Sequence, residues 1–496
     1  MKKTVVLTSG QNFVWHSMQE IIPEIERSWS STQVADSHQV DIINVDDLRL
    51  SHILPRVIDA THIVLACFTL RLSQIGKLLR EKFKIDARFI IYVHNQASIG
   101  FWPFLEWGLG EVLRSSDLFI CSSRRDALSL NQVFFDPRSE VVPFTLPELG
   151  RSLLSAQTHP NKPESNSEMD QICFAYIGRI SSQKNIHTLI EACHILTREH
   201  QALPFRLEIY GKEDGLGSPN MGVRDFAYED FLKNLIKSVT IEARIQWMGH
   251  WERIDLNERM TRNKPIFVSA SLHADENFGM AAFRALCGGQ LAVLSDWGGH
   301  YDFKSAFKEQ VFLVKAYGDS HGPFISPADL ALQMSDAAKF SHANLQTTPP
   351  NPYCPMQIKN RLLEFVQEAS QPDRPLQFTS LARDIHSFRK KYQSEGSGPC
   401  QIFSSYSDPL AQPLFKAYGM TQHSNDQKHF KGKILKTPAW VRYSNNAFHI
   451  TDPHRGHNKM DISLAKDGRP VETLDGTQIL VDLTNALELM ERGYVY

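Results

Sequence analysis

The sequence contains no apolar run of the roughly 18 residues that a membrane-spanning helix needs. Its first residues, MKKTVVLTSGQNF, carry two lysines but too short an apolar stretch for the core of a signal peptide. The formal net charge is −2, so the chain lacks the strong basic field by which a general nucleic-acid binder attracts its ligand. These absences predict a cytoplasmic protein that does not bind nucleic acid.

Cysteine pairs and nucleotide-binding glycine patterns are also missing. None of the seven cysteines forms a C-x-x-C pair, and most lie in apolar segments, so we expect buried free thiols in a reducing compartment. No G-x-G-x-x-G follows the first expected strand, which argues against a dinucleotide-dependent dehydrogenase, and no P-loop pattern occurs. The histidines of HITDPHRGH (449–457) have no cysteine partners, so we predict no metal site.

Short apolar runs alternate with segments of helical spacing through most of the chain. Within residues 1–147 the expected strands include KTVVLTSG (3–10), HIVLACF (62–68), RFIIYVHN (88–95), DLFICSS (117–123) and SEVVPF (139–144). A polar, turn-rich linker follows at 148–170, and the alternation restarts over 171–350. Continuous apolar strands separated by amphipathic helices are typical of parallel sheets covered on both faces.

The expected fold class is therefore α/β, with two tandem Rossmann-like, doubly wound domains facing a central cleft and a small C-terminal α+β extension. Residues 351–393 are predicted to form closing helices, 394–435 a polar connection and 436–496 a small module. In this module AWVRYSNNAFHITD (439–452) indicates a hairpin around Asn445-Asn446, and the last segment indicates a helix ending at Gly493. The module is faintly similar to winged-helix modules that bind peptides or partner proteins.

The segment CFAYIGRISSQKNIHTLIEAC (173–193) places two cations between an expected strand and an expected helix. Arg179 follows the strand and Lys184 precedes the helix, beside the unpaired N–H groups of its first turn. Arginine offers a planar fork and lysine a point charge, which together suit a diphosphate. The alternative is that both are solvated loop charges.

A second segment, FVSASLHADENFGMAAFRALCGGQLAVLSDWGGHYDF (267–303), also passes from a strand through a loop into a helix. Glu276 lies on that loop, where a carboxylate could accept hydrogen bonds from sugar hydroxyls. Asn277, Phe278 and Gly279 follow it with backbone N–H groups, and Gly279 allows close approach of a ligand. The alternative for Glu276 is an acid that stabilises the helix dipole.

Together these two segments resemble the C-terminal domain of the retaining nucleotide-sugar glycosyltransferases with the GT-B fold, of the "glycosyl transferases group 1" type. The spacing between the two segments also fits that domain, as do the intervening stretches LEIYGKEDG and QWMGHW. The first domain of that set is also similar to stretches of this chain, namely YVHNQ and LRSSDLFICSSRRDALSL, but these matches are less specific than the two segments above. The resemblance covers about residues 1–370.

The resemblance implies a role for each matching residue. Gly178, Arg179 and Lys184 would hold the diphosphate of a UDP- or GDP-linked sugar donor and stabilise the charge on the leaving group, without a metal or another cofactor. Glu276 would bind the donor sugar, and Asn277 to Gly279 would touch the sugar or phosphate. His94 would face the sugar from the first domain, unless it is simply a packed histidine at a strand end. The acceptor side would contain Gly10, Gln11 and Asn12, where a single glycine replaces the usual pair.

One position departs from the family pattern. The family carries two Glu separated by seven residues, the second usually bound to the nucleotide ribose, and here Arg284 occupies the second position. Arginine only donates hydrogen bonds, so it cannot accept from ribose hydroxyls. The chain is therefore expected to be either a metal-independent retaining hexosyltransferase or a degenerate subunit that binds a glycan, peptide or partner enzyme. A glycoside phosphorylase is disfavoured because no lysine for a pyridoxal cofactor is identifiable.

The acceptor is expected to be a glycan, a lipid-linked molecule or a protein. A peripheral membrane contact would use the basic segment that contains Arg71, Lys77, Arg80, Lys82 and Lys84, as in relatives with lipid-linked acceptors. The alternative is a solvated outer face. A partner protein would bind through the C-terminal module.

Overall fold

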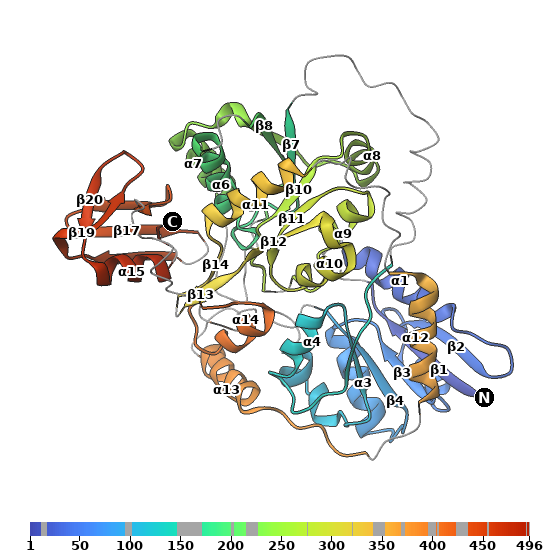
Figure 1. Cartoon of the computed structure of the whole chain (residues 1–496). Coiled ribbons are helices and arrows are strands. Elements are labelled where there is room, and N and C mark those ends of the chain that lie inside the picture. The colour runs from blue at the N-terminus through green and yellow to red at the C-terminus, as the bar shows by residue number, and fades with distance from the viewer. Residues whose placement is uncertain are drawn as a thin grey trace. The chain divides into compact units, whose positions relative to one another are not determined.

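The computed structural model describes most of the 496-residue chain (Figure 1). The described residues are 1–10, 17–94, 102–145, 171–199, 203–214, 227–274, 276–319, 321–340, 353–368, 373–394, 403, 406–422, 435–453, 456–492 and 494–495. The chain divides into two compact units, Met1–Arg151 with Pro350–Ser397, and Ser152–Pro349 with Gly398–Tyr496. The predicted linker 148–170 lies outside the described residues.

The first unit is built on a six-stranded sheet in the order β2-β1-β3-β4-β5-β6, and all its pairs are parallel. Val5, Val64 and Ile91 are fully buried, as expected for strands covered on both faces. The strands are β1 (Lys2–Thr8), β2 (His38–Asn44), β3 (His62–Leu65), β4 (Arg88–Val93), β5 (Leu118–Cys121) and β6 (Ser139–Val141).

Helices α1 (Met18–Ser30), α2 (Leu50–Val57), α3 (Leu70–Glu81) and α4 (Arg124–Leu130) connect these strands, with the turns η2 (Trp102–Glu106) and η3 (Leu109–Val112). Thr69 and Ser123 cap α3 and α4 through their hydroxyls. The outward basic face expected around α3 is only partly present. Arg80 is buried against Asp117, with Nη2 3.0 Å from Oδ1, so its charge does not face solvent.

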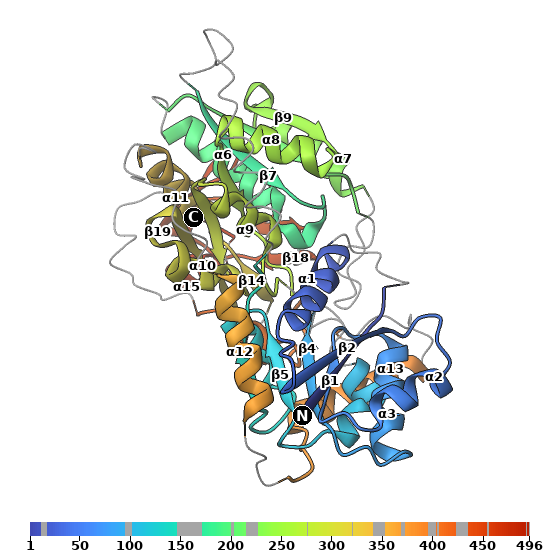
Figure 2. The ribbon, with the colours of Figure 1, turned by 90° about the vertical axis from the view of Figure 1, so that its right-hand side faces the viewer.

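Two helices from far along the chain, α12 (Pro355–Gln367) and α13 (Ser380–Ser394), belong to this first unit. In Figure 2, α12 runs beside the sheet. Arg88, the first residue of β4, donates from Nη1 to Phe365 O at 3.1 Å, and Lys2 donates to Val366 O. These contacts place the C-terminal end of α12 at the amino ends of β1 and β4.

The second unit contains another six-stranded sheet, in the order β12-β11-β10-β7-β8-β9, with parallel pairs throughout. Its strands are β7 (Ile172–Ile177), β8 (Phe205–Tyr210), β9 (Ile245–Gly249), β10 (Ile266–Ser269), β11 (Ala292–Asp296) and β12 (Val311–Lys315). Its helices are α6 (Ile186–Glu199), α7 (Tyr228–Ser238), α8 (Arg253–Asn263), α9 (Met280–Cys287), α10 (His300–Phe307) and α11 (Pro327–Lys339). Both units are thus Rossmann-like, and the prediction of two tandem doubly wound domains is confirmed.

The region beyond residue 400 has more structure than predicted. A short helix, α14 (Gln412–Tyr418), lies in the expected polar connection, and the hairpin β13 (Tyr317–Asp319) and β14 (Gly322–Phe324) lies near it. The terminal module has two small sheets, β15-β19-β20 and β16-β17-β18, and among the described residues one helix, α15 (Leu483–Glu491). The strands are β15 (Leu435–Lys436), β16 (Val441–Ser444), β17 (Ala447–Asp452), β18 (Gly456–Asp461), β19 (Leu464–Glu472) and β20 (Gln478–Val481).

The predicted hairpin is present in that module. Asn445 and Asn446 connect β16 to β17 with φ of 52° and 57°, as a type I′ turn requires. The module packs on α6. The centroids of the Trp440 and His187 rings lie 5.0 Å apart, and Ala439 N donates to Glu191 Oε2 at 3.3 Å. None of the described helices has the length and apolar character that crossing a bilayer requires.

Candidate active site

The carboxyl ends of β7 and β10 are neighbours in the second sheet, since Ile266 pairs with Phe174 and Phe267 with Ala175. Arg179 follows β7, and the 3₁₀ turn η4 (Ser182–Lys184) leads into α6. Asn185 ends that turn in the left-handed region, with φ of 56°. Glu276 lies on the loop between β10 and α9. The parallel pairing therefore brings both sequence motifs to one edge, where ligands bind in such folds.

Lys184 and Glu276 form an ion pair at this edge. Lys184 Nζ lies 2.6 Å from Glu276 Oε2, and the Ser271 hydroxyl donates to the same oxygen at 2.6 Å. The other oxygen, Oε1, lies 4.0 Å from His300 Nε2. The side chains of Lys184 and Glu276 are only 16% and 11% exposed, so this pair is shielded from bulk water.

The Glu276 carboxyl is held ionised. Burial by itself would raise its pKa, but the charges of Lys184, His300 and His273 outweigh that effect and keep the pKa well below its usual range. An ionised carboxylate accepts hydrogen bonds and donates none. Glu276 therefore has the protonation state that binding of sugar hydroxyls requires.

Arg179 is also paired, which the sequence did not indicate. Its guanidinium contacts the carboxylate of Asp214, a residue just beyond β8. Tyr176 holds the backbone there by donating from its hydroxyl to Arg179 O at 2.7 Å. Both predicted diphosphate-binding cations thus contact acidic side chains in the structure.

Glycines allow the ends of β7 and β8 to come close together. Gly211 has φ of +149°, and a Cβ at this position would lie 1.9 Å from Gly178 O. Gly178 N in turn donates to Tyr210 O at 3.0 Å. Any side chain at Gly211 would push these strand ends apart, so the position requires glycine.

The residues after Glu276 have separate roles. Gly279 caps α9 with φ of +86°, and a Cβ there would lie 2.7 Å from the His300 ring. Asn277 Oδ1 accepts from Phe278 N at 3.0 Å. Phe278 is 2% exposed and packs against Phe283, so only its backbone is available to a ligand.

Arg284 lies in α9 and is half-buried. Burial lowers the pKa of its guanidinium to about 10, which leaves the group charged at neutral pH. The position therefore carries a positive charge and no hydrogen-bond acceptor.

The loop Trp297–Gly299 belongs to the second sequence motif, although no residue of it was assigned to the site, and it packs directly on the Glu276 loop. Gly299 N donates to Glu276 O at 2.6 Å, and Trp297 Nε1 donates to His273 O at 2.7 Å. Gly298 has φ of +51°, and a Cβ there would lie 2.1 Å from Glu276 O. The pattern DWGGH, with paired glycines just after a strand, is the signal that could have identified this contact.

His94 lies at the carboxyl end of β4, in the first unit. Its Nε2 donates to Ala66 O at 3.2 Å, and among the described residues its Nδ1 has no hydrogen-bond partner. Burial lowers the pKa of His94 to about 4, only partly offset by the bond to Ala66. The ring is therefore neutral at pH 7, with Nδ1 left as an acceptor. Its predicted approach to the donor sugar stays a prediction.

Gly10 lies at the end of β1, next to β3. Its N–H donates to Asp46 Oδ2 at 2.6 Å, and Ser9 Oγ donates to Asp46 Oδ1 at 2.5 Å. No atom of the described structure lies within 4 Å of a Cβ placed on Gly10, so the backbone there is open to a ligand. Gln11 and Asn12 lie outside the described residues.

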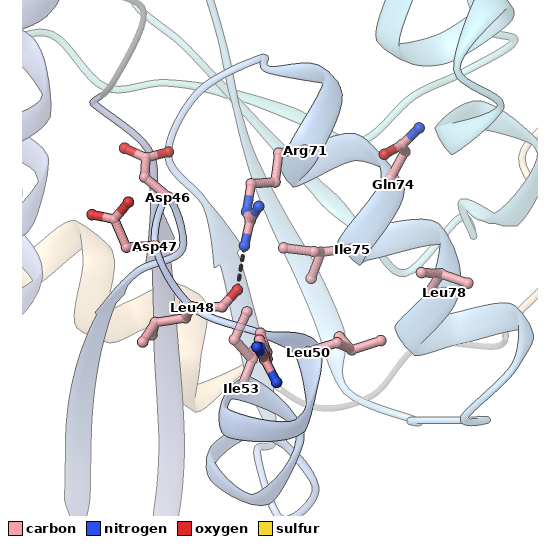
Figure 3. Close-up of a pocket in the computed structure, with 10 residues that line it drawn as sticks. Asp46, Asp47, Leu48, Leu50, Ile53, Arg71, Gln74, Ile75 and Leu78 are labelled. Carbon is pink, nitrogen blue, oxygen red and sulfur yellow. Dashed lines mark hydrogen bonds between the residues drawn. The ribbon is translucent and has the colours of Figure 1, made fainter.

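A pocket of about 510 Å³ opens beside Asp46. Figure 3 shows side chains from the β2–α2 loop, α2 and α3 around it, with Arg71 donating to Leu48 O. The apolar lining residues are Leu48, Leu50, Ile53, Ile75 and Leu78, and the polar ones are Asp46, Asp47, Arg49, Arg71 and Gln74. The pocket thus combines an apolar wall with charges of both signs. The sequence did not indicate it, because its lining comes from three separate segments.

Residues 157–321 match the family model described as "Glycosyl transferases group 1". No curated protein matches the chain.

Solved structures of low identity also match the chain, with TM-scores just under 0.5. The UDP-forming α,α-trehalose-phosphate synthase from Burkholderia xenovorans is 11% identical with a TM-score of 0.49, covering 75% of this chain and 100% of its own. A structure titled "Trehalose-6-phosphate from E. coli bound with UDP-2-fluoro glucose" is 12% identical with a TM-score of 0.48. The match covers 75% of this chain and 100% of that one. The lipopolysaccharide outer core galactosyltransferase WaaB is 13% identical with a TM-score of 0.47. The match covers 74% of this chain and 99% of that one.

Proposed function

Because residues 157–321 match the family model described as "Glycosyl transferases group 1", we propose that this chain transfers a hexose from a UDP- or GDP-linked donor to an acceptor hydroxyl with retention of configuration. The acceptor is a glycan, a lipid-linked molecule or a protein. The observation that carries the proposal is the buried Lys184–Glu276 pair, 2.6 Å apart at the carboxyl ends of adjacent strands. It joins a diphosphate-binding cation to a sugar-binding carboxylate.

Each charged residue has a role in the proposed reaction. The bond between the sugar C1 and the β-phosphate oxygen breaks, and its electron pair leaves with the nucleoside diphosphate. Lys184 and Arg179 stabilise the charge that accumulates on that leaving group. The acceptor hydroxyl bonds to C1 on the same face, and its proton passes to the departing phosphate oxygen. Glu276 accepts hydrogen bonds from the sugar and fixes its position.

The first unit supplies the acceptor side of this proposal. The open backbone at Gly10 and the pocket beside it share Asp46, which contacts Ser9 and Gly10 and also lines the pocket. An acceptor with an apolar portion next to its reacting hydroxyl fits a wall of leucine and isoleucine with a polar rim. The predicted approach of His94 to the donor sugar is part of this proposal, although the ring is neutral and buried and its Nδ1 has no hydrogen-bond partner among the described residues.

A second candidate function is a subunit that binds without transferring. The observation that favours it is Arg284, because an arginine cannot accept hydrogen bonds from the ribose. This subunit would bind a glycan, a peptide or a partner enzyme.

Calorimetric titration with UDP-, GDP- and ADP-linked sugars, followed by product analysis, tests both candidates. Binding of one donor and formation of a product with the donor's anomeric configuration would support the transferase. Binding without turnover over a broad panel of acceptors would favour the second candidate. A failure of all three nucleotides and their sugars to bind would refute both the donor site and the transferase.

A further inference from the structure

Residues 406–422 lie outside the segment that matches the family model, in the stretch that the sequence predicted to be a polar connection. The segment contains α14 and three aromatic residues that are each 1% exposed: Tyr406, Phe415 and Tyr418. Burial of this extent shows that the segment is part of the core of the second unit.

This segment contacts the Trp297–Gly299 loop. Gly298 N donates to Tyr418 O at 2.9 Å. The centroid of the Trp297 ring lies 5.8 Å from that of the Tyr418 ring and 5.9 Å from that of the Phe415 ring. A Cβ at Gly298 would lie 3.1 Å from Tyr418 Cε1, so the tyrosine ring covers the glycine closely. The loop is thus held by both a backbone hydrogen bond and aromatic packing.

The other side of the same loop holds the Glu276 backbone. Gly299 N donates to Glu276 O at 2.6 Å, and Trp297 Nε1 donates to His273 O at 2.7 Å. These two bonds fix the Glu276 loop at two points, three residues apart. Tyr418, the Trp297–Gly299 loop and Glu276 therefore form a continuous series of contacts.

The segment is also anchored away from the site. Thr421 N donates to Ala316 O at 3.0 Å, and Gly318 N donates to Thr421 O at 3.0 Å. Met420 packs against Gly318, where a Cβ would lie 2.2 Å from its sulfur. The end of α14 is therefore tied to the hairpin that begins with β13, and it cannot shift freely when a ligand binds near Glu276.

We propose that residues 406–422 are a positioning element for Glu276, with Tyr418 as its principal residue. The inference deepens the proposed function, since it assumes that Glu276 contacts the donor sugar. The physical reason is geometric: a displacement of about 1 Å in a group that holds the reacting sugar can lower the rate about a hundredfold. A loop rich in glycine needs support from a second layer of residues to hold such a group in place.

Hydrogen exchange of the full-length chain tests the positioning without any assay of activity. In Tyr418→Ala we expect faster exchange in peptides covering 271–300, which contain the amides of Gly298 and Gly299. Tyr418→Phe keeps the ring and the backbone carbonyl, so its exchange should match the wild type. Tyr494→Ala removes another tyrosine that is 1% exposed, in the terminal module, and should leave exchange in 271–300 unchanged.

Kinetics of the same variants test the consequence for transfer. Tyr418→Ala should lower kcat about 10- to 100-fold with little change in the KM for the donor, because the position of the sugar rather than its diphosphate contacts is disturbed. Tyr418→Phe should restore kcat. Tyr418→Leu, which keeps apolar volume but no flat ring over Gly298, replaces Tyr418→Ala if that variant does not fold.

The outcomes separate the inference from the function on which it depends. Unchanged exchange in 271–300 in Tyr418→Ala, or an equal change in Tyr494→Ala, overturns the positioning role whatever the activity. Faster exchange with unchanged kcat also overturns it, because Glu276 would then not need the support. If the wild-type chain binds no nucleotide sugar, the proposed function fails, and the exchange result still stands as a test of the contacts.

Discussion

Lys184 Nζ and Glu276 Oε2 lie 2.6 Å apart although 92 residues separate them in the chain. The pair is mostly buried, and removal of one partner from a buried pair leaves an uncompensated charge. In the proposed reaction the same two groups contact the nucleotide sugar, Lys184 at the phosphate and Glu276 at the sugar.

Lys184→Ala and Arg179→Ala should each weaken binding of the donor nucleotide by about 2 kcal/mol or more, because each removes a charge-assisted contact with the diphosphate. Calorimetry with the free nucleoside diphosphate measures this directly. Lys237→Ala is the control, since Lys237 is exposed near the end of α7 and no sequence motif of the site includes it. Unchanged affinity in both site variants would refute the assigned diphosphate site.

The sequence was sufficient to identify the strand–loop–helix units that carry Arg179, Lys184 and Glu276. Parallel pairing of β7 and β10 then brings their loops together, as the fold class requires. Asp214 and Tyr418 were missed because their contacts depend on tertiary packing between segments with no shared pattern. Trp297 lies in the same motif as Glu276, but its packing on the Glu276 loop could not be read from the sequence. Arg80 was misjudged for a similar reason: its buried partner Asp117 is 37 residues away, and charge composition alone favours solvent.

Gly298→Ala should displace the Glu276 backbone, because the new Cβ would lie 2.1 Å from Glu276 O at a φ of +51°. We expect a loss of stability of about 1–3 kcal/mol from backbone strain, together with a marked loss of donor-sugar turnover. Gly476→Ala is the matched control, because Gly476 also has positive φ, +84°, but nothing lies within 4 Å of its Cβ position. Both variants carry the backbone strain of an alanine at positive φ, but only Gly298→Ala adds the clash with Glu276 O. Urea unfolding and turnover measured on both therefore separate the two effects. Equal turnover in the two would contradict the contact.

Arg284→Glu tests whether the departure from the family pattern limits the enzyme. The substitution restores a carboxylate that can accept hydrogen bonds from ribose hydroxyls. Increased donor turnover would show that the natural chain is a weakened member of the family, whereas loss of activity would assign Arg284 a role of its own. Arg284→Met, which removes the charge and adds no oxygen acceptor for hydrogen bonds, distinguishes the effect of the new carboxylate from simple loss of the cation.

Leu78→Asp should raise the KM for the acceptor and leave nucleotide binding unchanged, because Leu78 lines the apolar wall of the pocket in the first unit (Figure 3). Binding of an apolar group against this wall would then strip water from the new carboxylate, which is strongly unfavourable. Leu128→Asp is the control, since Leu128 is 52% exposed on α4 and does not line the pocket. A tenfold change in KM corresponds to about 1.4 kcal/mol. An identical KM in both variants would remove the pocket from the acceptor site.

Acid should destabilise the chain through His94. Its pKa is lowered to about 4 in the folded state, against about 6.5 in an unfolded chain, because burial disfavours the charged ring. Between these values the unfolded chain binds one more proton than the folded chain, so stability falls as pH decreases from about 6.5 to about 4, by up to about 1.4 kcal/mol per pH unit. His62, whose pKa is lowered to about 3 chiefly by burial, contributes in the same direction. Urea unfolding of the wild type, His94→Asn and His62→Gln between pH 4 and 7.5 measures each contribution. A slope as steep in both variants as in the wild type would show that neither ring is held neutral by burial.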